Sequence, residues 1–178
     1  MDKAIIHYIR LRHGLIMGER TAEDVKIKIG SAFEGKKKKE TSDKKKEDNS
    51  QLSTLNSPLN KMAVVRGRDI ETGLPKSLRI TEVEIREALA PVLAEIMEAI
   101  ADVLQEAPPE LTNDILTHGI LLTGGGSMLS GLDQLIIERT KIPVVLSEDP
   151  LTSVVRGLGK VLENDQLLQR VKVVGGLK

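Results

Sequence analysis

The sequence predicts an α/β fold, and three observations support this prediction. Residues 120–123 and 143–146 are short apolar runs typical of buried parallel strands. Between them lie a glycine-rich turn and the helical pattern of residues 132–139, so this part of the chain indicates a right-handed βαβ unit. Residues 62–80 read as a β-hairpin and lead directly into the longest helical pattern of the chain.

The N-terminal segment is predicted to be helical. Apolar side chains recur at three- and four-residue steps over residues 2–17, and Gly18 is expected to end this first helix. Thr21 then resembles a helix N-cap, with Asp24 in the first turn of a short helix that continues to Gly30.

A lysine-rich segment follows. Residues 36–48 hold seven lysines and four acids, which leaves 19 basic and 22 acidic residues elsewhere, so the remainder is mildly acidic although the whole chain has a formal net charge of zero. Residues 35–60 contain too few apolar side chains to offset the entropy of ordering them, which predicts a disordered loop. No aromatic residue is interleaved to stack on a base, so nucleic acid is not expected as a partner.

The predicted hairpin and the helix after it are marked by local signals. Strand-like residues 62–68 and 76–80 are joined by a turn that contains glycine and proline. Thr81 and Glu84 have the spacing of a capping box, and the apolar stripe beyond them extends over some 25 residues. Pro91 lies inside this helical pattern and removes one backbone hydrogen bond.

The glycine-rich turn is the segment that indicates a binding site. Gly124, Gly125 and Gly126 directly follow the first apolar run, and Ser130 is placed to cap the next helix. Glycines let a backbone approach a ligand closely, and their N–H groups favour an anion or a polar ring edge, so the turn is a candidate nucleotide site. The alternative is that these glycines only allow the helix to pack closely on the sheet.

Two common nucleotide motifs are not matched. In a dinucleotide-binding fingerprint the third glycine would fall on Leu129, although Glu148 lies where a ribose-binding acid would be expected. No lysine followed by serine or threonine completes a Walker loop. A Rossmann-type nucleotide-cofactor enzyme therefore remains an alternative on these residues.

Composition excludes further classes. The chain has no cysteine, so disulfides, thiolate metal sites and a cysteine nucleophile are excluded, and its three histidines lack the spacing of a zinc site. No metal site is therefore predicted. No apolar stretch approaches the roughly 20 residues of a membrane span, and early charged residues argue against a secretion signal.

Several segments in order resemble one family. The stretch ILLTGGGSMLSGLDQLI is similar to the adenosine motif of the actin and heat-shock chaperone ATPase superfamily. The stretches GERTAEDVKIKIGSAF, ETGLP, EIREAL, PPEL and EDPLTSVVRGLGKVL narrow the resemblance to MreB, the bacterial actins that direct rod shape. It covers nearly the whole chain apart from the lysine-rich segment and the last dozen residues.

The resemblance implies an actin-like ATPase fold fragment that binds ATP. On one side of the nucleotide, the helix around Thr21 would supply adenosine-contacting positions, which are Glu23, Asp24, Val25 and Lys26. On the other side, the glycine turn would pack its backbone against the purine and α-phosphate through Thr123, Gly124, Gly125, Gly126 and Ser127.

The resemblance also implies parts that the sequence lacks. The two phosphate loops and the catalytic acid of the family do not occur here, so the chain matches the C-terminal half, Mg²⁺ would be held mainly by the other half, and no catalytic residue is predicted. The expected division is an outer subdomain over residues 1–80, an inner subdomain over 81–153, and a C-terminal helix and tail over 154–178. That last helix is expected to begin at Asp149 and Pro150.

The function implied by the resemblance is ATP-dependent filament assembly for cell-shape control. Expected partners are further copies of the protein and membrane-associated cell-wall morphogenesis proteins, and the expected location is cytoplasmic, at the inner face of the membrane. A stand-alone module that regulates filaments is a second alternative. Because the phosphate clamps are absent, the isolated chain is expected to bind ATP weakly and not to hydrolyse it.

Overall fold

The computed structural model describes residues 1–33 and 61–174. The predicted disordered loop at 35–60 lies outside the described residues. In chain order the elements are α1 (Asp2–His13), β1 (Leu15–Ile16), α2 (Glu19–Ile29), β2 (Met62–Asp69), β3 (Pro75–Thr81), α3 (Glu82–Glu106), α4 (Pro109–His118), β4 (Ile120–Leu122), the 3₁₀ helix η2 (Gly125–Met128), α5 (Leu132–Thr140), β5 (Val144–Leu146), α6 (Ser153–Leu162) and α7 (Asp165–Val174).

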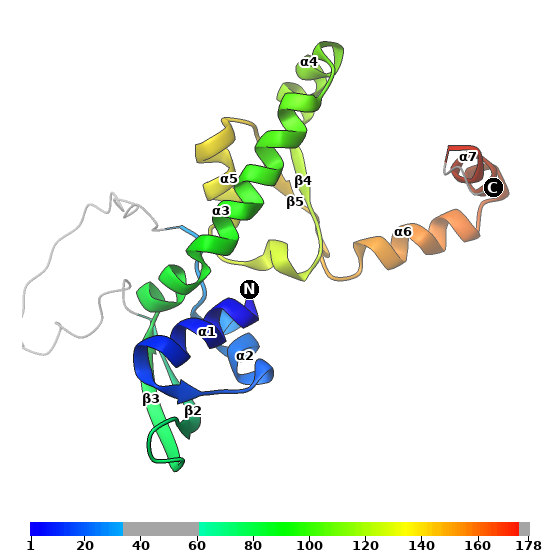
Figure 1. Ribbon diagram of the computed structural model, residues 1–178. Coiled ribbons are helices and arrows are strands. Elements are labelled where there is room, and N and C mark those ends of the chain that lie inside the picture. The colour runs from blue at the N-terminus through cyan, green and yellow to red at the C-terminus, as the bar shows by residue number, and fades with distance from the viewer. Residues whose placement is uncertain (34–60, 175–178) are drawn as a thin grey trace, which may run out of the picture.

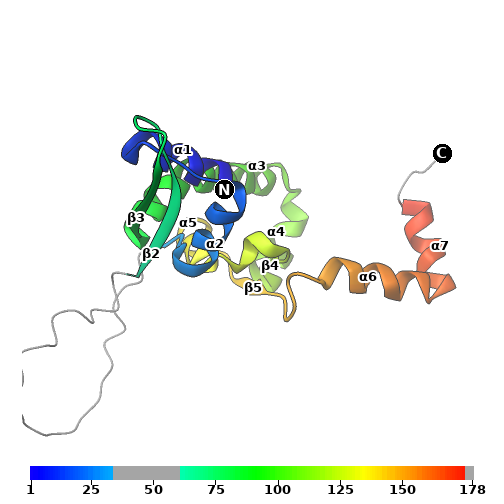
Figure 2. The same cartoon turned by 90° about the horizontal axis from the view of Figure 1, so that it is seen from below.

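The described elements form two sheets joined by one long helix. Strands β1, β2 and β3 make an antiparallel sheet in that order, and β4 pairs with β5 in parallel. Helix α3 runs from the end of β3 to α4, past both groups (Figure 1). Seen from two directions, α6 and α7 extend away from the rest of the fold (Figures 1 and 2). Helices and both kinds of strand pairing confirm the predicted α/β class.

The first helix is shorter than predicted. Gly14 adopts a left-handed conformation (φ 61°) that ends α1 at His13, and residues 15–16 then pair with β2 as a short strand. Ile5 and Ile9 are fully buried, as their spacing indicates. The prediction was wrong about the end of the helix because Gly14 alone ends it. The spacing of apolar residues does not indicate where such a glycine changes the direction of the chain.

The start of α2 also differs from the prediction. The helix begins at Glu19 with Gly18 as its N-cap, and the Ala22 N–H donates to the Gly18 carbonyl at 3.2 Å. Thr21 therefore lies within the first turn and does not cap it. An extended glycine can replace a side-chain cap by leaving its neighbouring N–H groups open to solvent.

Helix α5 begins at Leu132 as predicted, but its predicted cap was wrong, and so was the predicted start of α6. Ser130 forms a parallel β-bridge with Ser31, so it belongs to an extended segment, and α5 begins after Gly131. Helix α6 begins at Ser153, because Asp149 and Pro150 form a turn before it; the Ser153 N–H donates to the Asp149 carbonyl at 3.0 Å. In each case a main-chain contact outside the helix decides its boundary.

The hairpin and the capping box are confirmed. β2 and β3 pair from Met62 opposite Thr81 to Arg68 opposite Pro75. The Thr81 N–H donates to Glu84 Oε2 at 2.9 Å, and the Glu84 N–H donates back to Thr81 Oγ1 at 3.4 Å. Helix α3 spans 25 residues with Pro91 inside it.

The main core lies between α1, α2, α3 and the antiparallel sheet. Its largest fully buried side chains are Ile5, Ile9, Leu15, Ile80, Ile85, Leu89, Ile136 and Val65. All of them are aliphatic, and none is aromatic. Because close packing of such side chains fixes the elements that carry them, this core holds α2 in a defined orientation relative to α3 and α5.

The parallel strands pair as predicted but are not fully buried. Ile120, Leu122 and Val144 pack against the core, whereas Leu121 is 67% and Val145 53% exposed. Side chains alternate across a strand, and among the described elements α5 covers only one face of this two-stranded sheet. The apolar runs predicted a sheet covered on both faces.

Candidate functional site

A pocket of about 610 Å³ lies between α2 and the glycine turn, and we call it the glycine-turn pocket. It is lined by Met1, Glu23, Lys26, Ile27, Lys28, Gly30, Lys61, Gly125, Gly126, Met128, Leu129, Ser130 and Leu151. Segments separated by about a hundred positions along the chain thus face each other across one cavity.

Helix α2 presents one face to this pocket because its opposite face is buried. Ala22, Val25 and Ile29 belong to the core, and their spacing of three and four residues defines the buried stripe. Glu23 and Lys26 lie off that stripe and reach the glycine-turn pocket. The predicted α2 positions therefore do not all face this pocket.

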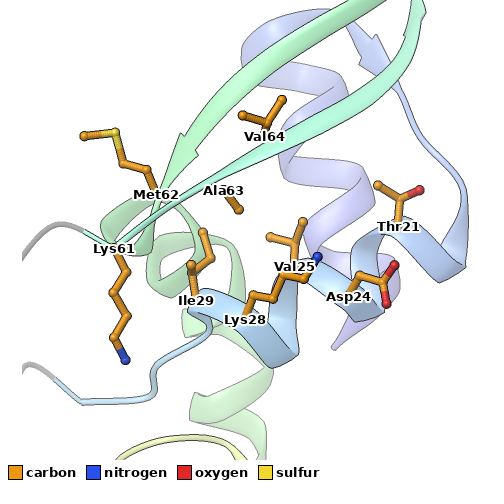
Figure 3. A pocket seen from close by; sticks show the side chains of 9 residues that line it. All are labelled: Thr21, Asp24, Val25, Lys28, Ile29, Lys61, Met62, Ala63 and Val64. Atoms are coloured by element: carbon orange, nitrogen blue, oxygen red, sulfur yellow. The ribbon is translucent and has the colours of Figure 1, made fainter.

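The remaining predicted α2 positions do not line this pocket. Val25 is only 3% exposed and packs in the core. Asp24 lines a separate pocket between α2 and β2, where Val25 forms part of the wall (Figure 3). Of the four positions taken from the resemblance, the structure brings Glu23 and Lys26 to the glycine turn.

The glycine turn meets the pocket through its middle. Gly125 and Gly126 line it, while Gly124 adopts φ 84° and donates its N–H to the Pro150 carbonyl at 2.7 Å. The hydroxyl of Thr123 also donates to Pro150, and the Ser127 hydroxyl donates to the Gly124 carbonyl. Thr123, Gly124 and Ser127 therefore hold the turn in shape, and none of them lines the pocket.

The fold itself does not require glycine at position 126. A Cβ built there meets no atom within 4 Å, and its φ is not positive. Among the described residues, no acceptor is found for the N–H of Gly125 or of Gly126. Open space beside two available N–H donors is what a ligand that approaches the backbone would use.

The pocket has a basic rim and an apolar wall. Lys26, Lys28 and Lys61 line it together with one acid, Glu23. Lys26 Nζ lies 2.8 Å from Asp2 Oδ1 in an ion pair. Ile27, Met128, Leu129 and Leu151 supply the apolar part. Cations beside an apolar wall suit a ligand with an anionic end and a flat apolar end.

A short main-chain link holds the two sides of the pocket together. Ser31 forms a β-bridge with Ser130, and the Ala32 N–H donates to the Ser130 carbonyl at 2.8 Å. A Cβ on Gly30 would lie 2.3 Å from the Lys26 carbonyl oxygen and 3.1 Å from Leu129 Cδ1, so the α2 end can approach the turn only with glycine there. Sequence reasoning missed this link, because Gly30 was interpreted only as a helix end.

The acid required by a Rossmann-type site lies elsewhere. Glu148 lines a separate pocket with Arg156 and Lys160, and that pocket shares no lining residue with the glycine-turn pocket. In the described ranges, no three histidine, aspartate or glutamate side chains gather as a metal site. None of the helices in those ranges is long and apolar enough to cross a membrane.

Comparison with known proteins gives one consistent result. A family model described as MreB/Mbl protein matches residues 1–48 and 41–170. The chain is 42% identical over 162 residues to the cell shape-determining protein MreB of Escherichia coli K12, covering 91% of this chain and 40% of that protein. It is 37% identical over 172 residues to the cell shape-determining protein Mbl of Bacillus subtilis 168, covering 97% and 45%. The chain thus spans less than half the length of these relatives.

Solved structures agree with the sequence matches. The ADP-bound MreB5 of Spiroplasma citri superposes with a TM-score of 0.76 at 27% identity, over 98% of this chain and 45% of that one. The AMPPNP-bound form of the same protein gives 0.75 at 29% identity, over 99% and 45%. A MamK double helical filament gives 0.64 at 22% identity, over 92% and 43%, and supports the fold alone.

Proposed function

Because the chain belongs to the MreB/Mbl family and has its actin-like fold, we propose that the glycine-turn pocket binds the adenosine part of ATP. The observation that carries the proposal is the meeting of Glu23 and Lys26 with Gly125 and Gly126 around one cavity. The two similar Spiroplasma citri structures are bound to ADP and to AMPPNP, which supports a nucleotide as the ligand.

The residues fit the two ends of such a ligand. The purine would lie against Ile27, Met128 and Leu151, and the proposed anion-facing groups are the Gly125 and Gly126 N–H donors. Lys26 and Lys28 would add positive charge at the rim. Asp24 and Val25 would act indirectly, by fixing the helix that carries Glu23 and Lys26. Thr123, Gly124 and Ser127 would act by holding the shape of the turn.

Phosphoryl transfer needs groups that these residues do not provide. Hydrolysis depends on phosphate clamps, a metal ion and a positioned water, and bound Mg²⁺ would supply charge neutralisation at the phosphates. The described residues present no cluster of acidic ligands at the pocket, so we propose that Mg²⁺ is held mainly by groups outside them. The chain would then bind nucleotide without hydrolysing it.

The wider role proposed is that of the family. Two relatives are named cell shape-determining proteins, which supports a role in cell shape. We propose that this role consists of filament assembly with further copies at the inner face of the cell membrane, with cell-wall morphogenesis proteins as partners. We also propose the division into an outer unit over residues 1–80, an inner unit over 81–153 and a C-terminal segment over 154–178.

Calorimetric titration of the 178-residue chain with ATP and with NAD tests the proposed ligand. Weak but saturable heat with ATP, and weaker binding of NAD at equal concentration, is the expected result. Tighter binding of NAD than of ATP would favour a dinucleotide-cofactor protein and contradict the proposal.

A further inference from the structure

The edge of β2 beside α2 is incompletely paired. Strand β1 contacts β2 only through Leu15 opposite Asp69 and Ile16 opposite Arg68, and the chain then turns away into α2 at Glu19. On its other side β2 pairs with β3 from Met62 onward. The first half of β2 therefore has one paired and one open edge.

Hydrogen bonds identify the residues that face the open edge. The Lys61 carbonyl accepts from Glu82 and the Asp69 N–H donates to Leu74, so the odd-numbered residues of β2 bond toward β3. Consistent with this alternation, the Ile70 N–H donates to Gly14 on the opposite side. Backbone groups alternate in direction along a strand, so those of Met62, Val64 and Arg66 point to the open edge.

Among the described residues, these three have backbone groups that find no partner. Within residues 1–33 and 61–174, no acceptor or donor pairs with the N–H or C=O of Met62, Val64 or Arg66 on the open side. Their side chains are also exposed, with Met62 58% and Val64 61% accessible. An exposed strand edge with apolar side chains is a template for another strand.

A pocket of about 420 Å³ adjoins this edge, and we call it the strand-edge pocket. Figure 3 shows α2 along one side and the β2 residues 62–64 along the other. Ala63, Val25 and Ile29 form its apolar part. The pocket gives an incoming strand a place for the side chains that point toward α2.

The charges around the edge favour an acidic occupant. Lys28 and Lys61 line the strand-edge pocket with a single acid, Asp24. On the exposed face of the sheet, Arg66 follows Val64, and Arg79 lies directly opposite Val64 on β3. A second copy pairing edge to edge would bring the same cations together, which makes it an unfavourable occupant.

We propose that the open edge of β2 from Met62 to Arg66 binds an extended segment of a partner protein in which acidic and apolar residues alternate. The segment adds a strand to the sheet, as in β-augmentation. Because side chains alternate across a strand, its apolar residues enter the strand-edge pocket and its acids face Arg66 and Arg79. The strand-edge pocket shares Lys28 and Lys61 with the glycine-turn pocket, but the backbone groups that would bind the segment belong to β2 and not to the glycine turn.

The heptapeptide Glu-Val-Glu-Val-Glu-Val-Glu, acetylated and amidated, is a direct probe. Added to the 178-residue chain, it is expected to slow hydrogen exchange at the amides of Met62, Val64 and Arg66. Val64→Pro removes the N–H that faces the open edge and leaves the β3 side intact, so it should weaken peptide binding about tenfold. Val64→Thr keeps that N–H and serves as the matched control.

Charge and folding are tested separately. Arg66→Glu should weaken binding of the acidic peptide, and the corresponding Lys-Val peptide should bind the native chain at least about tenfold more weakly. Circular dichroism melts establish that each variant is folded before its affinity is compared.

The proposal is wrong if the three amides are already protected in the free chain or if the acidic peptide does not bind. Equal binding of both peptides, equal binding to Val64→Pro, or self-association through β2 would also overturn it.

Discussion

His13 Nε2 lies 2.8 Å from Glu84 Oε1 and joins the last residue of α1 to the first turn of α3. The other carboxylate oxygen, Oε2, accepts from the Thr81 N–H and hydroxyl, each at 2.9 Å. One partly buried carboxylate thus closes the capping box of α3 and fixes the N-terminal helix against it.

This carboxylate makes stability depend on pH. Burial raises the pKa of Glu84, but hydrogen bonds from Thr81 and His13 outweigh it, so the pKa lies below its ordinary value of 4.5. Because the pKa of Glu84 is lower in the folded state, its carboxylate stabilises the fold above pH 4.5. This stabilisation is lost as pH falls from 4.5 through the folded-state pKa. Urea unfolding of the native chain should lose stability over that window, and Glu84→Gln should lose less. An equal loss in both would contradict the assigned role.

The capping box itself can be tested at neutral pH. Thr81→Ala removes the hydroxyl that accepts from the Glu84 N–H and should lower the free energy of unfolding by about 1 kcal/mol. Thr81→Ser keeps a hydroxyl and should stay close to the native value. Equal stability of the alanine and serine variants in urea titrations would show that the cap contributes nothing measurable.

Tyr8 gives a spectroscopic test of the α1–α3 contact, since it is the only tyrosine in the sequence. Burial, a hydrogen bond to Glu87 and the charge of Glu87 raise the pKa of Tyr8 to about 12. Ultraviolet titration of tyrosinate should therefore show a midpoint near 12, and Glu87→Ala should bring it down toward 10.0.

The same shift has a consequence for stability. The pKa of Tyr8 is higher in the folded state than in the unfolded state. The protonated Tyr8 therefore stabilises the fold below pH 10.0, and this stabilisation is lost as pH rises to about 12. Circular dichroism recorded alongside the titration detects any unfolding. A midpoint near 10.0 while the native spectrum persists would show that Tyr8 does not contact Glu87 as described.

Core and exposed apolar residues should respond very differently to truncation. Ile9 is fully buried between α1 and its neighbours, so Ile9→Ala should cost about 2–5 kcal/mol. Val155 on α6 is 69% exposed, and Val155→Ser should change the free energy of unfolding by no more than about 0.5 kcal/mol. Denaturant titration of both variants checks the contrast, and a comparable loss in Val155→Ser would mean that α6 is packed in solution.

Much of the fold could be predicted from local sequence signals. The hairpin, the capping box at Thr81 and the parallel pairing of residues 120–122 with 144–146 each follow from chemistry confined to a few neighbouring residues. Some predictions that failed depended on distant contacts, whereas the end of α1 is set locally by the left-handed conformation of Gly14. Serine commonly caps helices, but the conformation of Ser130 is decided by its β-bridge to Ser31.

The candidate site was predicted in part. The resemblance selected both walls of the glycine-turn pocket, and the structure brings Glu23, Lys26, Gly125 and Gly126 to it. It could not separate Asp24 from Glu23, because the face that each residue occupies depends on how α2 packs. Leu151 was also missed, because nothing in its local sequence indicates that it lies beside Gly125, 26 positions earlier in the chain.

The most direct test of the proposed nucleotide site is ATP binding to Gly126→Val. A side chain at position 126 meets open space, so the variant should keep its circular dichroism spectrum and melting temperature while the new side chain blocks access to the N–H donors. Gly157→Val on α6, where a Cβ also meets no atom within 4 Å, is the matched control. Calorimetry should detect ATP binding by the native chain and by Gly157→Val, and none by Gly126→Val. Unchanged ATP affinity in a folded Gly126→Val protein would contradict the assignment of the site.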